Sequence, residues 1–504
     1  MYNHRIAVEE KSTSYQRPLA TKYGVQVVVG TAPINLAQNP EAVVNRPVMV
    51  GSYEEAVKAL GYSEDWQSYT LCQSMYASFK QFRVYPIIFI NVLDPKKHIK
   101  EVEEKTHPVF NHTVKLEEIG ILPGSIRLND GTANIVGKAA VGSAQIGSPG
   151  EIPELKPDED YIATFDEEGK VQITFLSTGK GYDLKSVAIT CSCLAPELVT
   201  EEDIIGYRDI EAGKDTGIEL IRKIYTMFHC PPGLILAPSW SKNSNVAAAI
   251  QEKCRDENGG LRCECVIDLD TSKVKRYTEC GIEKEKAGLT DPHTIAVWPE
   301  LLVNGKNIAF SAVYGAMASY YTATNGDVPY LYPSNKELQA DGAVLEDGTE
   351  VILDQTQAAY VNGDGVVTAL NDSGWKSFGN NTGCYPKIQD PKDRWIGCRR
   401  MFSFVANYFM IEFSSMLDQG MNRINIDDMV NRFNTWGNSL VSQGRCAGIK
   451  MEYIKEDNLD EDLLNGHVKV QIMVAPFTPM EYIAATEEFD METLRKAIVG
   501  EVEA

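Results

Sequence analysis

The sequence predicts an α/β core domain that contains an inserted all-β domain and is followed by an α+β domain. Three observations lead to this class. The stretch Gly233–Asp268 has the pattern strand, helix, strand, and such a βαβ unit implies a parallel sheet with a right-handed crossover. From about His107 to Cys193 the helical period disappears, and glycine and proline become frequent. After residue 393, two long helical patterns precede two short alternating ones.

These changes of pattern divide the chain into five parts. The expected division is an N-terminal arm at 1–20, a discontinuous α/β core at 21–106 and 196–392, an inserted β domain at 107–195, a C-terminal α+β domain at 393–489 and a tail at 490–504.

Strands and helices alternate before the insert. Val25–Pro33 and Pro86–Pro95 are apolar runs ended by glycine or proline, which is typical of buried strands. Ser52 is a suitable N-cap for a helix over Tyr53–Gly61. Tyr69–Phe82 carries apolar residues on one side and predicts a second helix.

Short alternating runs and turns indicate that the insert is all-β. Tyr161–Ser177 predicts a β-hairpin with its turn at Asp166–Gly169, and Tyr182–Leu194 predicts a further strand. The α/β pattern then resumes near Glu201. The elements expected up to residue 392 are helices at Thr216–His229, Ser244–Cys254 and Ala309–Ala323, strands at Gly233–Ser241, Leu261–Asp270 and Thr294–Pro299, and a hairpin at Ala343–Leu353.

The last domain combines helices with strands. We expect helices over Arg394–Leu417 and Ile424–Gly444, followed by strands at Ile449–Ile454 and His467–Pro476. Met480–Phe489 is one more potential strand. Because Pro476 and Pro479 precede it, this segment should leave the sheet rather than extend it.

Composition narrows the classes of function. The net charge of −22 argues against a nucleic-acid partner, because phosphate binding needs a basic surface. No apolar run approaches the length of a membrane span, and the first residues lack the apolar segment of a signal peptide. The 11 cysteines are scattered and odd in number, which favours a reducing cytosol over a disulfide framework. The two CxC pairs, Cys191/Cys193 and Cys263/Cys265, are expected to be core thiols.

Catalytic motifs are weak. Asp268, His293 and Ser311 occur in an order that some serine hydrolases use, but neither Ser311 nor Ser239 lies in a glycine-flanked nucleophile turn. The sequence has no GxxxxGK[ST] loop, no HExxH motif and no EF-hand spacing. We therefore expect no catalytic, cofactor-binding or metal-binding residues, and no cofactor.

Several motifs in order resemble the contractile tail sheath proteins of long-tailed phages and R-type bacteriocins. The resemblance covers most of the chain except the β insert. The matching segments are Val27–Pro33, Pro232–Ser241, Val266–Asp270, Ala296–Leu302, Pro329–Leu338, Gly374–Thr382, Trp395–Phe409, Gly444–Tyr453 and Gly466–Ile483.

The resemblance implies a fold and a function. The core would have a subtilisin-like topology without the protease's active site. The chain would be a structural subunit that polymerises as helical stacked rings around an inner tube, and that contracts to drive the tube through a target cell envelope. Its partners would be further copies of itself, the inner tail tube protein, and baseplate and tail terminator proteins, with no nucleic acid and no membrane insertion by this chain. It would reside in a virion tail or bacteriocin particle assembled in the host bacterial cytoplasm.

Specific residues carry this hypothesis. The two chain ends are expected to be strands exchanged between subunits, and Arg423 and Arg432 are candidate tube contacts because basic residues are scarce in this acidic chain. The arm residues are Ile6, Val8, Tyr482 and Ile483. Two alternatives are a catalytically active subtilisin-like hydrolase and another structural protein of a virion or baseplate.

Overall fold

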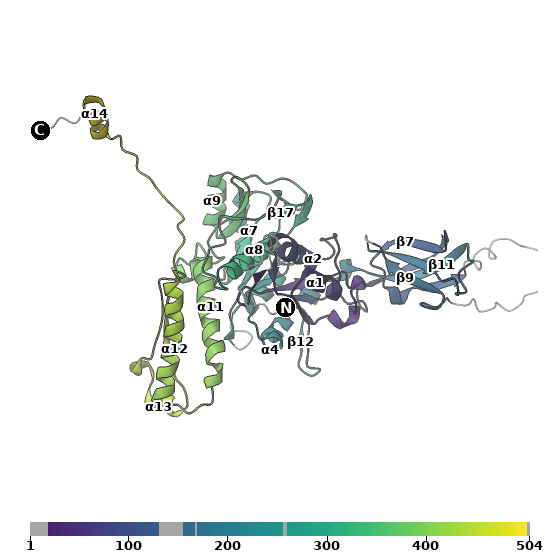
Figure 1. The fold of residues 1–504 in the computed structure, drawn as a ribbon, viewed down its shortest axis with the longest axis horizontal. Helices are drawn as coiled ribbons and strands as arrows, with labels where there is room; N and C mark the ends of the chain where they lie inside the picture. Colours follow the sequence, from purple (N-terminus) through teal and green to yellow (C-terminus); the bar gives the residue numbers. More distant parts are fainter. Residues whose placement is uncertain (1–18, 131–154, 167–168, 256–259, 501–504) are drawn as a thin grey trace, which may run out of the picture.

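The computed structural model describes residues 19–130, 155–166, 169–255 and 260–500. A central α/β domain carries a β-rich projection on one side and a pair of long helices on the other (Figure 1). Within the described ranges, no helix is both long and apolar enough to cross a membrane.

The centre of the molecule is a mixed sheet with nine strands in the described part of the chain, in the order β19-β22-β21-β16-β15-β14-β2-β5-β3. The inner strands are parallel and the strands near both edges are antiparallel. The parallel strands are β2 (Gln26–Gly30), β5 (Ile87–Asn91), β14 (Leu234–Leu236), β15 (Glu264–Asp268), β16 (Thr294–Val297) and β21 (Val366–Asn371); the antiparallel strands are β3 (Pro47–Val50), β19 (Lys336–Glu337) and β22 (Trp375–Phe378).

Helices cover the sheet, so its central strands are buried on both faces. This explains why those strands are continuous apolar runs instead of alternating ones. The expected βαβ unit is present, with β14 and β15 parallel and α5 between them in the chain. The larger helices of this domain are α1 (Tyr53–Leu60), α5 (Ser244–Lys253), α7 (Cys280–Lys286), α8 (Phe310–Thr324) and α9 (Gln355–Gly363), and shorter ones are α2 (Leu71–Met75), α3 (Glu201–Ile205) and α4 (Ile224–Phe228).

The small residues of α8 allow this helix to lie close to the sheet. A Cβ atom added at Gly315 would stand 2.6 Å from Leu236 Cδ1 and 2.9 Å from Gln26 Oε1. Gly315 thus lets α8 approach β14 and β2 at the middle of the sheet, where a larger residue would force the layers apart.

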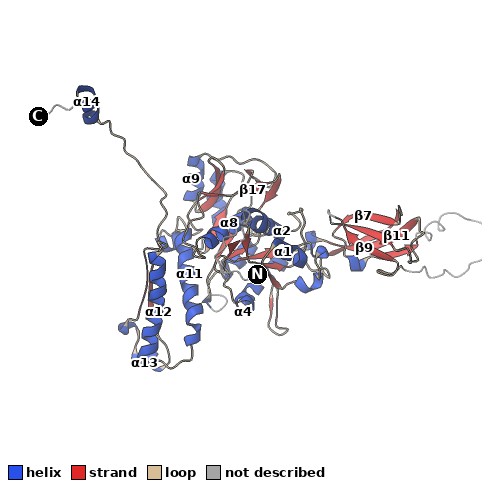
Figure 2. Ribbon diagram, viewed as in Figure 1, coloured by secondary structure: helices blue, strands red, loops and turns tan. Residues whose placement is uncertain are grey.

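The insert contains two three-stranded antiparallel sheets with their own apolar core (Figure 2). One sheet has the order β7-β10-β9 and the other β6-β11-β8. The predicted hairpin is confirmed by the pairing of Val171 with Phe165. Strand β6 starts at Ile99, before the expected start of the insert at 107. The strands are β6 (Ile99–Pro108), β7 (Thr113–Ile119), β8 (Arg127–Asp130), β9 (Tyr161–Phe165), β10 (Lys170–Phe175) and β11 (Ser186–Leu194).

The C-terminal region packs two long helices against a two-stranded antiparallel sheet. Its core combines aliphatic residues and methionines with three phenylalanines, of which Phe433 is completely buried. The elements are α11 (Ile396–Phe413), α12 (Arg423–Ser442), β23 (Gly448–Glu452), the short α13 (Asp460–Leu464), β24 (Gln471–Ala475) and α14 (Met491–Val499).

Two predicted helices differ from the expectation. Thr216–His229 is a 3-10 helix over Gly217–Lys223 followed by α4, because the turn at Gly217 (φ 57°) packs against the backbone of Ile204 and excludes a regular helical start. The helix expected over Tyr69–Phe82 is α-helical only at α2 and continues as a π-helix over Tyr76–Phe82.

Two strand predictions were also too long, for reasons of pairing. The Ala343–Leu353 hairpin is present but short: Val344 bridges to Glu350, and backbone hydrogen bonds of 2.8 Å join Leu345 to Thr349 and Val351 to Ala343, while the other edge of β20 (Gly342–Val344) pairs with β17 (Glu300–Val303). The strand expected over His467–Pro476 is limited to β24, since its partner β23 offers only Gly448–Glu452.

Candidate assembly interface

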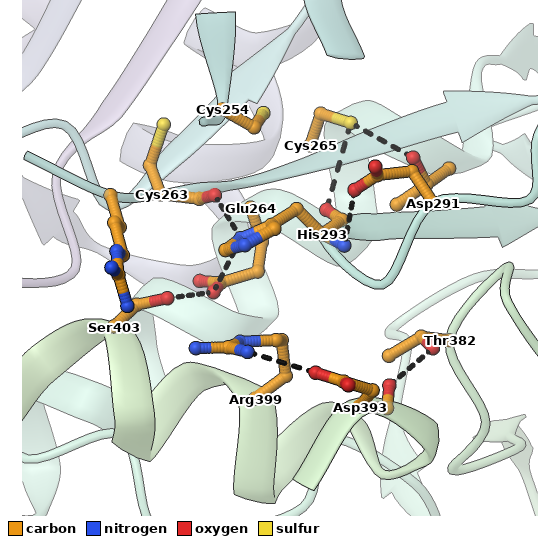
Figure 3. A network of polar contacts seen from close by, with 12 residues as sticks. Cys254, Cys263, Glu264, Cys265, Asp291, His293, Thr382, Asp393, Arg399 and Ser403 are labelled. Carbon is orange, nitrogen blue, oxygen red and sulfur yellow. Dashed lines mark hydrogen bonds and ion pairs between the residues drawn. The ribbon is translucent and has the colours of Figure 1, made fainter. Parts of the chain in front are cut away.

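The residues that follow a serine-hydrolase order do not form a triad. Ser311 Oγ donates to Asp268 Oδ2 at 2.5 Å, and Ser241 Oγ donates to the same oxygen at 2.9 Å. His293 lies elsewhere: its Nδ1 is 3.0 Å from the carbonyl oxygen of Cys263 and 3.6 Å from Glu264 Oε1 (Figure 3). Burial raises the pKa of Asp268, although the hydrogen bonds from the two serines oppose the shift. Asp268 thus ties β15 to the start of α8.

Ser239 is likewise placed as a structural residue. It has a left-handed backbone (φ 64°), and its Oγ accepts a hydrogen bond of 2.9 Å from Gln73 Nε2. A glutamine amide is not a general base, so this contact does not activate the hydroxyl as a nucleophile.

The cysteines are buried thiols, as expected. All 11 are free and buried, including both CxC pairs. Cys254 lies near Cys263 and Cys265 in Figure 3, and burial and hydrogen bonding to these two thiols raise its pKa well above the usual range. A thiol that stays protonated is a poor metal ligand. In the described ranges, no group of three or more potential ligands is arranged to hold a metal ion.

A buried polar network fixes α11 to the central sheet. Ser403 Oγ donates to Glu264 Oε1 at 2.6 Å, and Asn407 exchanges two hydrogen bonds with the backbone of Arg262, at 2.7 and 2.8 Å (Figure 3 shows the Glu264 part). Burial alone would raise the pKa of Glu264, but hydrogen bonds from His293 and Ser403 and the charge of Arg400 hold it below its ordinary value. These contacts join α11 to the first residue of β15 and to the segment just before it.

The two candidate tube contacts lie on α12 and already have acidic neighbours. Arg423 Nε is 3.0 Å from Asp427 Oδ2, one turn away on the same helix. Arg432 pairs with Glu412 of α11 and lies 3.7 Å from Asp428 Oδ2. Both arginines are substantially exposed, and ion pairs of this kind contribute little to stability. A partner's carboxylates could therefore replace the present ones at small cost.

The arm residues fall into two groups. Ile6 and Val8 lie outside the described residues. Tyr482 and Ile483 are 85% and 77% exposed and belong to an extended segment without strand partners in the described chain. Before it, Tyr332 Oη donates to the carbonyl oxygen of Phe477 at 2.9 Å and Glu481 Oε2 lies 3.6 Å from Arg394 Nη2, so the chain leaves the body after Glu481. The C-terminal arm thus exposes large apolar side chains that nothing in the described part of its own subunit covers.

The base of the N-terminal arm is held by one carboxylate. Asp327 accepts hydrogen bonds from the backbone N–H groups of Lys22 (2.9 Å) and Tyr23 (3.1 Å) and from the Thr21 hydroxyl (2.5 Å). Tyr23 then packs edge-to-face against Phe404 of α11, with ring centroids 4.8 Å apart. The chain therefore enters the body next to the C-terminal helices.

Sequence reasoning missed the surface that such arms would need. Strands β23 and β24 form a separate two-stranded sheet packed on α12. A two-stranded sheet is marginal by itself and has open edges that present unpaired backbone groups. The alternation of apolar and polar residues predicted strands β23 and β24. No residue pattern indicated that this sheet would have only these two strands in the described chain.

Comparison with known proteins gives the decisive observation. No family model matches the chain. The tail sheath protein of Burkholderia phage BcepMu, however, is 22% identical over 520 aligned positions, which cover 98% of both chains. A putative prophage major tail sheath protein of Pseudomonas aeruginosa is 20% identical over 72% of this chain and 94% of its own length. The chain is therefore similar, over nearly its whole length, to contractile tail sheath proteins.

Solved structures of contractile systems share the fold of this chain. A chain of the anti-feeding prophage baseplate matches 96% of it with a TM-score of 0.55 and 13% identity, and covers 98% of its own length. A chain of the extracellular contractile injection system sheath complex, in the contracted state, matches 98% with a TM-score of 0.54 and 12% identity, and covers 99% of its own length. The mixed α/β architecture with several sheets is therefore a sheath-like fold.

Proposed function

We propose that this sheath protein polymerises as helical stacked rings around an inner tube, and that contraction of the polymer drives the tube through a target cell envelope. The proposal rests on two features that occur in the same chain: a C-terminal segment with exposed Tyr482 and Ile483, and a two-stranded sheet with open edges. An added strand from a neighbour would complete the sheet through backbone hydrogen bonds.

The energetics favour exchange between subunits. Ordering an extended segment costs about 1–2 kcal/mol per residue, whereas each new backbone hydrogen bond returns only about 0.5–1.5 kcal/mol. Burial of Tyr482 and Ile483 would add about 1.5–3 kcal/mol each. The balance becomes favourable when a ring neighbour holds the open edge at high local concentration. A chain linked in this way could rotate against its neighbours without detaching.

The remaining expectations form part of the same proposal. The α/β core would have a subtilisin-like topology, the β insert would lie on the outside, and the C-terminal domain would face the tube through α12, Arg423 and Arg432. The protein would be structural and not catalytic, and would act with tube, baseplate and terminator proteins in a tail or bacteriocin particle assembled in the bacterial cytoplasm. The contacts of Asp268 with two serines, and of His293 with Glu264, support the non-catalytic assignment.

Truncation of the arms tests the proposal. Removing residues 1–15, or replacing Tyr482 and Ile483 with Ser, should leave the thermal transition of the monomer unchanged and abolish long tubes in electron micrographs. A matched control is Ile352→Ser, since Ile352 is 68% exposed and lies on the central domain. Regular sheaths formed by both arm variants would refute arm exchange.

A further inference from the structure

The C-terminal helix α14 is an amphipathic helix without a partner in the described part of its own chain. Met491, Leu494 and Ile498 follow the i, i+3, i+7 spacing of one helical face, and they are 66%, 42% and 73% exposed. In Figure 1, α14 lies away from the body at the end of an extended segment. A helix of nine residues is marginal in water by itself. Its apolar face therefore requires a docking surface.

An apolar groove of about 750 Å³ lies at the far end of the α11–α12 pair. Its lining includes four methionines, whose flexible thioether side chains adapt well to an inserted helix. Two residues at its mouth, Leu417 and Met421, are 75% and 41% exposed. The principal apolar lining residues are Met410, Phe413, Met416, Met421, Met429 and Val470.

The charges of the two surfaces are complementary. Asp418 lines the groove, next to the carboxyl end of α11, where the helix dipole is negative. In α14, Arg495 and Lys496 lie in the last turns. Docking with the apolar face inward would bring Arg495, at the border of that face, toward the acidic end of the groove.

The groove of a second copy suits α14 better than the groove of its own chain. The last contacts of the chain with the body are made by Glu481, which lies near Arg394 and Asn380 just before the start of α11, whereas the groove is at the other end of that helix. In Figure 1 the extended segment runs away from that end. Residues 482–490 span at most about 30 Å, close to the ~27 Å length of the 18-residue α11, so docking in the chain's own groove would require this segment to run fully extended back along that helix. We propose that α14 docks into the α11–α12 groove of an adjacent copy, as a helical anchor beyond the exchanged strand.

This proposal rests on the proposed self-assembly but is separable from strand exchange. The groove shares no lining residue with the hollow that contains Arg432, Tyr408 and Trp436, although the Arg432 guanidinium lies 5.5 Å from the ring centroid of Phe413 in the groove lining. A tube contact confined to the Arg432 hollow would therefore leave the groove lining free for α14. Docking in the groove and strand exchange at β23–β24 use different surfaces, so each can fail without the other.

Cross-linking between two populations of full-length protein tests the docking. One population carries Ile498→Cys and the other carries Leu417→Cys with a size tag; the 11 native cysteines are buried and should react slowly. After mixing, assembly and oxidation, we expect a disulfide-linked dimer of unequal chains. Thr493→Cys, on the polar face of α14, is the matched control and should give at least about tenfold less dimer.

Each other outcome overturns the proposal. A compact monomer band from the doubly substituted chain, without dimer in the mixture, would place α14 in its own groove. If added tube protein protected the thiol introduced by Leu417→Cys, without dimer, the groove would belong to the tube. Regular tubes without any cross-link would refute docking and leave the proposed function intact, whereas absence of tubes from wild-type protein would refute both. As a second measurement, Leu494→Ser with Ile498→Ser should raise the critical concentration for assembly at least about tenfold.

Discussion

The contact between α12 and β23 depends on one glycine and provides a sharp test of the C-terminal domain. A Cβ atom added at Gly437 would lie 2.7 Å from the backbone oxygen of Ile449 and 3.1 Å from its side chain. Ordinary contacts of a Cβ begin near 3.4 Å. Because the opposing atom belongs to the backbone, relief requires displacement of β23 by several tenths of an ångström.

The magnitude follows from two opposing effects. Gly→Ala within a helix stabilises by about 0.5–1 kcal/mol through chain entropy and helix propensity. Overpacking of a tight contact costs about 1–3 kcal/mol. We expect Gly437→Ala to destabilise the C-terminal domain by about 1 kcal/mol, and to weaken sheath assembly because the β23–β24 sheet shifts. The same exchange at Gly363 of α9 meets nothing within 4 Å and should be neutral or slightly stabilising.

Limited proteolysis combined with thermal unfolding measures the difference. Cleavage of Gly437→Ala within 396–475 should be about fivefold faster than in wild type, since about 1 kcal/mol corresponds to that ratio of open to closed forms, while Gly363→Ala should match wild type. If Gly437→Ala resisted cleavage as well as wild type and assembled normally, the steric argument would be wrong.

Three further predictions address the junction, the helix surface and the insert. Because the pKa of Glu264 is lowered in the folded state, its charge stabilises the protein above the unfolded pKa of about 4.3, and this contribution is lost as pH falls through the folded pKa. The difference in unfolding free energy between wild type and Glu264→Gln, measured in urea titrations, should therefore shrink below pH ~4. A difference that stays constant with pH would exclude this role. Reversing charge at both Arg423 and Arg432 should reduce co-assembly with the tube at low salt, with little change in melting temperature; unchanged co-assembly would remove them as contacts. Replacing residues 99–194 by a Gly-Ser bridge should leave a folded core, as the separate apolar cluster of the insert implies, and loss of the thermal transition would contradict this.

Much of the core could be predicted because burial on both faces leaves a strong sequence signal. Apolar runs such as those around Val27 and Ile88 are central parallel strands, and the turn residues bounded them well. Boundaries set by tertiary pairing were less predictable: nothing local to His467 indicates that its partner strand ends at Glu452. The 3-10 start at Gly217 depends on contact with Ile204, a residue outside its own pattern.

The candidate interface was harder to predict than the fold. The pairing of Arg423 with Asp427 has the i, i+4 spacing of a helix and was visible in the sequence, whereas the pair of Arg432 with Glu412 joins two helices. Helix α14 lies within 490–504, for which the sequence predicted a tail; its nine residues carry only a short amphipathic pattern. The open edges of β23–β24 result from which strands the described chain lacks, and a sequence of one subunit does not contain that information.

The first and last residues of the β insert lie side by side, which bears on how the insert could be exchanged for another domain. Ile99 of β6 lies directly opposite Leu194 of β11, so the chain departs from the core and returns to it through two adjacent, paired residues. At the core, the chain therefore leaves and returns as the two strands of a single hairpin would. A foreign domain whose termini are equally close could be grafted at this pair without altering the register of the central sheet.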